Sequence, residues 1–328
     1  MRKHLLCTLI CSLFLSLSFG CTSKRTKILY TVYPIGYIIE RLVGENELYQ
    51  SIQSDNSIVQ EASIVDEYED VLDTGKVLFH IGDLEPYFVS HSTDIKNNGI
   101  TVVDLSSENT VYAFQRYTKQ ENEDGTVEYV TSPYYEGSTF DSVDMYEKDL
   151  CLWLDPITML SMASDIKDYL VSTNAAIAES IEQNYEDLEE DLISIDAQYQ
   201  NLANTLERNN QTIKFVSMSS CFGSWQKAFG FEVYPVVLSR YGSMPDDEQL
   251  ELIENRIKDD DVHYIAYESN MSEEMIDLYN KIKEDCDLTR VDLSNLSSLS
   301  DEEYNAGKDY ISIFYQNLQS LESIIESK

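Results

Sequence analysis

The sequence is poor in positive charge, and this shortage restricts what the protein can bind. It has 23 lysine and arginine residues against 59 aspartate and glutamate residues, a formal net charge of −36 at pH 7. A surface this acidic repels phosphate backbones, so nucleic-acid binding is disfavoured. Because hydrophobic residues make up 43% of the chain, the acidity belongs to the surface of a folded protein and does not indicate disorder.

The sequence also lacks the motifs of common enzyme classes. It contains no Walker loop, Gly-rich dinucleotide turn, G-x-S-x-G elbow or H-E-x-x-H motif. Beyond the first 21 residues, the histidines are His80, His91 and His263, and none has another His or Cys at metal-ligand spacing. We predict that the protein is not an enzyme. The remaining catalytic alternative is thiol chemistry at Cys151 or Cys221 with a distant histidine.

The first 21 residues have the pattern of a bacterial lipoprotein signal. A cationic start precedes an apolar run that is too short for a comfortable transmembrane helix, and Gly20 lies directly before Cys21. We expect removal of residues 1–20, lipidation of Cys21 and a tether over residues 21–27, which would anchor an extracytoplasmic protein to the bacterial cell membrane. The alternative is an ordinary signal peptide followed by a chance cysteine.

Few cysteines remain beyond this segment, and their pattern excludes a disulfide framework. They are Cys151, Cys221 and Cys286, an odd number at wide spacing. One pair with one free thiol and three buried thiols both fit this pattern, so the sequence alone leaves their pairing open.

Strands alternate with helices on both sides of a long periodic segment. "KILYTVYPIGYIIERLVGE" is typical of a strand, a turn and a helix, and "TIKFVSMSSCFGSWQKAFGF" restarts the same order. This alternation predicts an α/β fold of two lobes, residues 28–172 and 209–328, each with a parallel sheet and flanking helices. Residues 117–149 lack periodicity and predict an acidic surface loop with a small hairpin around Gly125. A functional lid and a solvated insertion are both open.

The segment 173–208 is the clearest helix in the sequence. Apolar residues recur three or four positions apart from Ile177 to Leu206, which predicts a helix roughly 50 Å long. A seven-residue repeat drifts about 20° per heptad on a straight helix. The apolar side must therefore turn from one lobe to the other, or the helix must supercoil with a second copy. We predict a monomer in which this helix links the lobes; a homodimeric coiled coil is the alternative.

The whole pattern resembles the zinc- and manganese-type solute-binding lipoproteins of ABC transporters, whose fold some surface adhesins share. The matching stretches keep their order over nearly the whole mature chain: "YPIGYIIERLVGE", "GDLEPYF", "CLWLDP", "STNAAIAESIEQNYEDLEEDLISIDAQY", "FVSMSSCFGSW", "YIAYESNMS" and "LSSLSDEE". The resemblance implies a metal ion, zinc or manganese, held between two lobes that the long helix keeps nearly rigid. It also implies delivery of that ion to an ABC permease and no catalysis.

The family's histidine ligands are replaced in this chain. Cys151 stands for the histidine of H-V-W-L-D-P, and Ser219 for the histidine after F-V-T-x. The resemblance therefore implies a metal site of altered composition. The residues at or near the family's site positions are Gln60, Glu61, Cys151, Ser219, Glu268, Asp292 and Ser294.

The replacements leave several interpretations of this site open. Zinc prefers thiolate and imidazole, whereas hydroxyl and amide oxygens are poor substitutes. Cys151 with carboxylates such as Glu61, Glu268 and Asp292 would form a weaker or differently selective site. The scaffold would otherwise bind another solute, or act as a surface interaction protein of the adhesin type. In that case Cys151 would be a small buried hydrophobe at a lobe junction.

Overall fold

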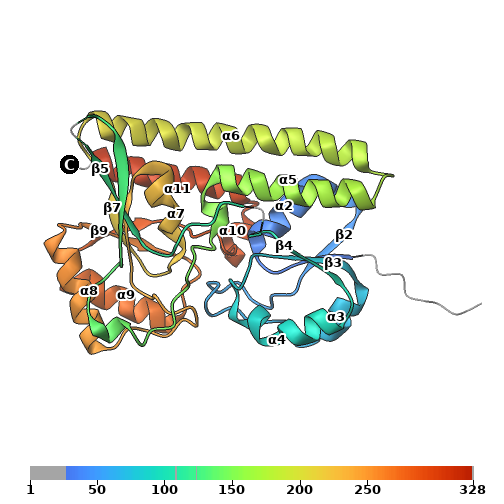
Figure 1. The fold of residues 1–328 in the computed structure, drawn as a ribbon, viewed down its shortest axis with the longest axis horizontal. Helices are drawn as coiled ribbons and strands as arrows, with labels where there is room; N and C mark the ends of the chain where they lie inside the picture. Colours follow the sequence, from blue (N-terminus) through green and yellow to red (C-terminus); the bar gives the residue numbers. More distant parts are fainter. Residues whose placement is uncertain (1–26, 108, 123, 327–328) are drawn as a thin grey trace, which may run out of the picture.

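The structure is a computed structural model that describes residues 27–107, 109–122 and 124–326. The predicted signal peptide and Cys21 lie outside these residues. Two α/β lobes lie side by side beneath a layer of long helices (Figure 1). This arrangement confirms the predicted fold class. No helix in the described part of the chain is long and apolar enough to cross a membrane.

The N-terminal lobe is built on a four-stranded parallel sheet in the order β2-β1-β3-β4. Strand β3, one of the two central strands, is almost entirely buried, as expected of a parallel sheet covered on both faces. The short helix η1 (Gly44–Asn46) precedes β2. The strands are β1 (Lys27–Tyr30), β2 (Leu48–Ser51), β3 (Gly75–His80) and β4 (Thr101–Asp104), and the helices are α2 (Tyr33–Val43), α3 (Tyr68–Thr74) and α4 (Pro86–Asn97).

The C-terminal lobe repeats this design with the strand order β10-β9-β7-β8, again all parallel. The predicted restart of strand, turn and helix is confirmed here, because β7 leads through η4 (Cys221–Gly223) into α7. The strands are β7 (Lys214–Ser217), β8 (Glu232–Pro235), β9 (Tyr264–Tyr267) and β10 (Thr289–Asp292). The helices are α7 (Ser224–Phe229), α8 (Asp247–Asp259), α9 (Glu273–Asp285), α10 (Asp301–Asn305) and α11 (Tyr310–Glu326).

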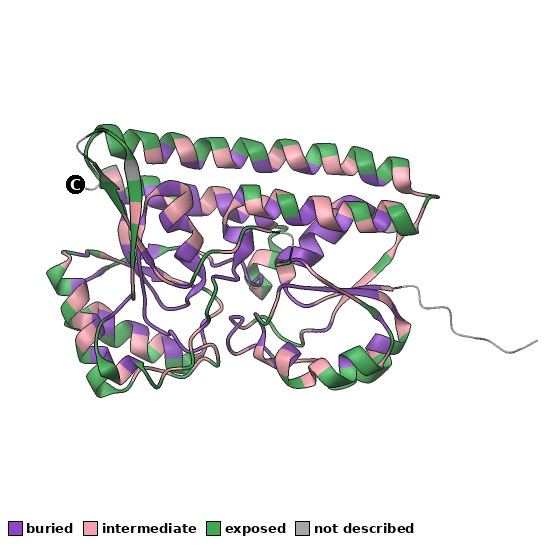
Figure 2. Ribbon diagram, in the orientation of Figure 1, coloured by how far each residue is buried: buried purple, intermediate pink, exposed green. Residues whose placement is uncertain are grey.

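The long helix α6 (Ala178–Arg208) runs over both lobes (Figure 1). It begins at Ala178 rather than at residue 173, because a short break separates it from α5 (Pro156–Thr173). Figure 2 shows that its outer side is exposed. Its inner side is buried through Ile181, Leu188, Leu192, Ile195, Tyr199, Leu202 and Leu206.

The inner side of α6 passes from one lobe to the other. Near its first half, Arg41 of α2 forms an ion pair with Asp191 at 2.8 Å. Further along, the Tyr199 hydroxyl donates a hydrogen bond to the Phe314 carbonyl oxygen of α11 at 2.9 Å. The apolar side is therefore covered within one chain, as the linking-helix prediction requires.

The segment from residue 117 to 149 differs from the predicted N-terminal surface loop. It contains the predicted hairpin, β5 (Arg116–Glu121) and β6 (Val127–Ser132), with Gly125 at a positive φ of 80° in the turn. The hairpin lies against the C-terminal lobe: Arg116 pairs with Glu232 at 3.2 Å and with Asp260 at 3.1 Å. The rest of the segment buries Tyr134, Tyr135, Phe140 and Tyr146, so it is packed structure and not a solvated insertion.

The contrast between the two sides of α6 can be tested with neighbouring substitutions. Leu192 is fully buried, whereas Ile193 is 48% exposed. We expect Leu192→Ala to lower the free energy of unfolding by about 3 kcal/mol, because it removes buried methyl groups and leaves a cavity. The matched control, Ile193→Ala, should change it by less than about 1 kcal/mol. Urea unfolding followed by circular dichroism measures both, and equal losses would contradict the assigned burial.

Candidate functional site at the seam between the lobes

The turn after β7 and the segment before α5 meet at a disulfide. Cys151 and Cys221 are bonded, with their Cα atoms 5.2 Å apart, and both are buried, with exposures of 4% and 0%. Cys286 is the free cysteine of the described residues. Of the two arrangements that the sequence left open, the structure therefore has one pair and one free thiol.

The sequence "CLWLDP" explains how Cys151 is held. Asp155 caps α5 by accepting a hydrogen bond from the Ile157 amide at 3.0 Å, and Pro156 starts the helix. Between Cys151 and this cap lies the short helix η3 (Leu152–Leu154). Two hydrogen bonds join it to the C-terminal lobe. The Trp153 indole donates to the Asn295 carbonyl oxygen, and the Trp225 indole donates to the Leu154 carbonyl oxygen, both at 2.8 Å.

A buried carboxylate lies beside the disulfide. Asp149 is 8% exposed, and its Oδ1 accepts a hydrogen bond from the Cys151 amide at 3.2 Å. Burial raises the pKa of Asp149 to about 7, although hydrogen bonds from the Cys151 and Ser224 backbone oppose the shift. Gly223 makes room for this side chain, since a Cβ at that position would lie 2.5 Å from Asp149 Oδ2. A side chain at residue 223 would therefore displace the carboxylate.

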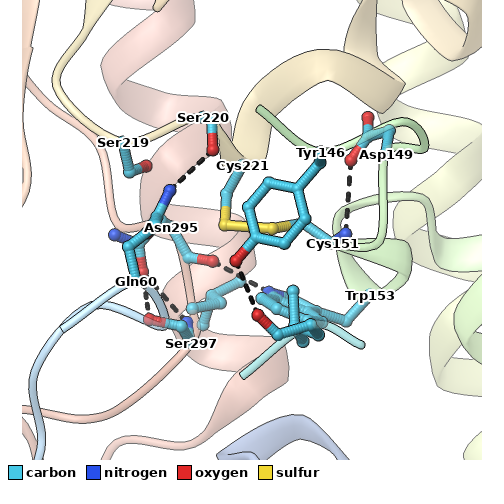
Figure 3. The surroundings of a disulfide bond; sticks show 12 residues. Gln60, Tyr146, Asp149, Cys151, Trp153, Ser219, Ser220, Cys221, Asn295 and Ser297 are labelled. Atoms are coloured by element: carbon cyan, nitrogen blue, oxygen red, sulfur yellow. Dashed lines mark hydrogen bonds between the residues drawn. A yellow bond between two sulfur atoms is a disulfide. The ribbon is translucent and has the colours of Figure 1, made fainter. Parts of the chain in front are cut away.

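Gln60 of the N-terminal lobe contacts the C-terminal lobe across the buried boundary between the lobes, which we call the seam. Its Nε2 donates to Ser220 Oγ in the C-terminal lobe at 2.6 Å (Figure 3). The residue is 2% exposed, and its Oε1 has no hydrogen-bond partner among the described residues. Figure 3 shows Gln60, Ser219 and Ser220 grouped beside the disulfide. The structure thus brings together three of the predicted positions, Gln60, Cys151 and Ser219.

Glu268 is fully buried and is used by its own lobe. Its Oε1 accepts hydrogen bonds from the Met218 and Ser219 amides, both at 2.9 Å, and its Oε2 accepts one from Asn295 Nδ2 at 2.6 Å. Burial raises the pKa of Glu268, while these hydrogen bonds lower it. In this arrangement the carboxylate fastens the turn after β7 to the loop after β10.

The remaining predicted positions have other partners. Glu61 Oε1 accepts a hydrogen bond from Ser272 Oγ across the seam at 3.1 Å. Asp292 is exposed and accepts a hydrogen bond from Arg290 Nε at 2.8 Å, and the Ser294 amide donates to Asn317. In the described part of the chain, no three His, Cys, Asp or Glu side chains are grouped as metal ligands. The ligand assignments therefore stay predictions.

Sequence reasoning missed a polar cluster in the loop after β10. Asn270 Nδ2 donates to Asn295 Oδ1 at 3.1 Å and to the Ser297 and Ser298 hydroxyls at 3.0 Å. Ser298 Oγ in turn donates to the Asn56 carbonyl oxygen of the other lobe at 2.7 Å. The only signal was the run of small polar residues in "SNLSSLS", which by itself is typical of any turn.

An opening between the lobes has five tyrosines among its lining residues. It is a groove of about 770 Å³ bordered by α2, β2 and the α10 region. Tyr304 on its rim is 75% exposed. Its aromatic lining consists of Tyr30, Tyr33, Tyr37, Tyr49 and Tyr304, and its carboxylates are Glu40, Asp55, Asp301 and Asp309.

Two parallel-sheet lobes joined by one rigid helix, with the turns of both sheets meeting at a buried polar seam, define a solute-binding protein of the helical-backbone type. The chain belongs to the family described as zinc-uptake complex component A, periplasmic, which matches residues 28–324. This family consists of transport binding proteins.

Individual relatives support this membership. The zinc-binding lipoprotein AdcA of Streptococcus pneumoniae R6 is 25% identical over 183 residues, which are 56% of this chain and 35% of that protein. The high-affinity zinc uptake system protein ZnuA of Bacillus subtilis 168 is 26% identical over 175 residues, 52% of this chain and 51% of that protein. The matches thus span between a third and half of these curated relatives.

A solved structure confirms the fold at lower sequence similarity. The periplasmic zinc-binding protein TroA of Treponema pallidum has a TM-score of 0.69 at 14% identity, covering 90% of this chain and 98% of that one. At this identity the likeness concerns the fold alone.

The disulfide can be checked by counting thiols. We expect the chain from Thr22 onward, denatured without reductant, to react with one equivalent of a thiol reagent, and with three after reduction. The Cys286→Ser variant should show none before reduction and two after it. Three reactive thiols before reduction would contradict the pairing.

The buried carboxyl of Glu85 predicts a pH dependence of stability. Burial raises its pKa to about 7 from an ordinary value of 4.5. Between these values the folded protein holds a proton that the unfolded chain releases, so the free energy of unfolding falls as the pH rises. Above pH 7 the full cost is about 3 kcal/mol. We expect Glu85→Gln to make this fall smaller by about that amount, measured by urea unfolding at pH 5 and pH 8. Asp149, whose pKa is also raised to about 7, should cause the part of the fall that is left.

The control for Glu85→Gln is Glu190→Gln, which makes the same change at an exposed carboxylate on α6. This variant should follow the wild-type pH dependence. If Glu85→Gln also followed the wild type, the raised pKa would be contradicted.

Proposed function

We propose that the protein is the extracytoplasmic solute-binding component of a zinc- or manganese-type ABC importer. In this role it is anchored to the cell membrane through Cys21, captures the metal ion between its lobes and delivers it to the permease, without catalysis. The observation that carries the proposal is the family match over residues 28–324, on a fold whose two lobes meet at one seam. We take zinc as the metal from the names of the relatives.

The structure supports transfer by a nearly rigid body. Helix α6 packs on elements of both lobes, and hydrogen bonds such as those of Gln60 to Ser220 and Ser272 to Glu61 cross the seam. A scaffold bridged in this way resists the wide hinge closure of other binding proteins. Release of the solute would then depend on small rearrangements of the turns at the seam.

A second candidate function follows from the composition of the seam. Cys151 is bonded to Cys221, and the described residues offer no group of three carboxylate, thiol or imidazole ligands. A family member with these substitutions would bind another solute, or act as an adhesin-like surface protein. The tyrosine-lined groove gives such a protein a second surface for recognition.

Metal uptake distinguishes the two functions. We expect a strain that lacks the gene to take up less ⁶⁵Zn or ⁵⁴Mn under chelator stress than the wild type, and the plasmid-borne gene to restore uptake. A plasmid encoding Cys21→Ala serves as a control for anchoring. Unchanged uptake of both metals in the deletion strain would overturn the importer role in favour of the second candidate.

A further inference from the structure

The disulfide lies beside the point at which Gln60 of the N-terminal lobe is hydrogen-bonded to Ser220 of the C-terminal lobe. Cys151 belongs to the segment that leads into α5, and Cys221 to the turn between β7 and α7. Each sulfur is bonded to the other, so neither is a thiolate that could hold a metal. The bond also fastens the segment before α5 to the turn after β7.

We propose that Cys151 and Cys221 form a redox-gated metal site, closed as the disulfide and able to capture a thiophilic divalent cation such as Zn²⁺ when reduced. This rests on the proposed function, because it regulates solute capture at the same seam. Two thiolates are strong ligands for zinc, which is commonly held by sulfur and nitrogen in tetrahedral sites. The cation replaces the covalent link by a coordinate one.

Oxygen donors flank both cysteines. Asp149 is hydrogen-bonded to the Cys151 amide, and Gln60 is hydrogen-bonded to Ser220, the residue before Cys221. Gln60 is 2% exposed, and its Oε1 lacks a partner among the described residues. An unsatisfied buried oxygen is costly in a folded protein, and a bound cation would satisfy it. Because the Asp149 carboxylate already accepts hydrogen bonds from the Cys151 and Ser224 backbone, we expect the unpartnered Gln60 Oε1 to be the oxygen that joins the two sulfurs in holding the metal.

The gate requires a dithiol reductant, of the kind found in thiol–disulfide oxidoreductases. A thiolate of the reductant attacks one protein sulfur and forms a mixed disulfide, and its second thiol displaces the protein cysteine. The reductant leaves as a disulfide, and the protein gains two electrons and two protons as two thiols. Metal binding then releases these two protons, because the ligands are thiolates.

Cys286 provides a matched control within the same chain. It follows α9, outside the seam, and burial raises its thiol pKa to about 11. A thiol with such a pKa is a poor metal ligand near neutral pH. Replacing it removes one thiol without touching the proposed site.

The test compares oxidised and reduced protein under argon, using the chain from Thr22 onward, which contains every described residue. A phosphine reduces the disulfide and is then removed. Cd²⁺ is the probe, because cadmium–thiolate bonds absorb in the ultraviolet, and Zn²⁺ competition gives the affinity for zinc. We expect the reduced protein to bind one Cd²⁺ and to show this absorption. The oxidised protein should bind Cd²⁺ with an affinity at least about tenfold lower and should not show the absorption.

Cysteine variants show which sulfurs hold the metal. Cys286→Ser should behave as the wild type, whereas Cys151→Ser and Cys221→Ser should each lose the two-thiolate absorption. Circular dichroism checks folding, and unfolding of the wild type on reduction would overturn the proposal, because a dithiol state could not then serve. Equal zinc binding by oxidised and reduced protein would also overturn it, yet leave the importer role standing. Failure of that role would show instead in the uptake assay.

Discussion

The continuous apolar side of α6 is the constraint on which the rest of the structure depends. Its buried residues run from Ile181 to Leu206 and pack first against the N-terminal lobe and then against the C-terminal one. A single helix that is packed at both ends sets the distance and orientation of the two sheets. The turns that follow the strands consequently meet at a seam narrow enough for single side chains to cross it. Gln60 and Ser220 do so directly, and a disulfide closes the same place.

The seam is polar but buried, and this combination determines its chemistry. Carboxylates such as Asp149 and Glu268 are buried and have raised pKa values, so burial opposes their ionisation while backbone amides favour it. Glu268 has its oxygens engaged by its own lobe, whereas Gln60 keeps an oxygen without a partner among the described residues. Of these groups, the sulfurs are the ones whose bonding changes with redox conditions. In the proposed metal site, capture depends on the thiol environment as well as on metal concentration.

Only a few of the acidic residues lie at the seam, and the others serve elsewhere. Many carboxylates lie on exposed helix faces, among them Glu182, Glu186 and Glu190 of α6, whose outer side is exposed (Figure 2). The scarce basic residues are used where they hold elements together. Arg116 ties the hairpin to the C-terminal lobe, and Lys227 lies over the rings of Tyr112 and Tyr117 at 4.3 and 4.9 Å. The long segment before Cys151 is thereby fixed in place, and it delivers that cysteine to the seam.

The sequence by itself determined the secondary structure, the two parallel sheets and the linking helix. These depend on local periodicity and on residues such as Pro34, which starts α2, and Gly125 in the hairpin turn, which act over a few positions. It also located Cys151 at a family site position. Only the tertiary structure decided that Cys151 pairs with Cys221, 70 residues away, that the hairpin joins the C-terminal lobe and that Glu268 is engaged within its own lobe. These contacts join residues far apart in the chain, and no local pattern encodes which distant partners packing brings together.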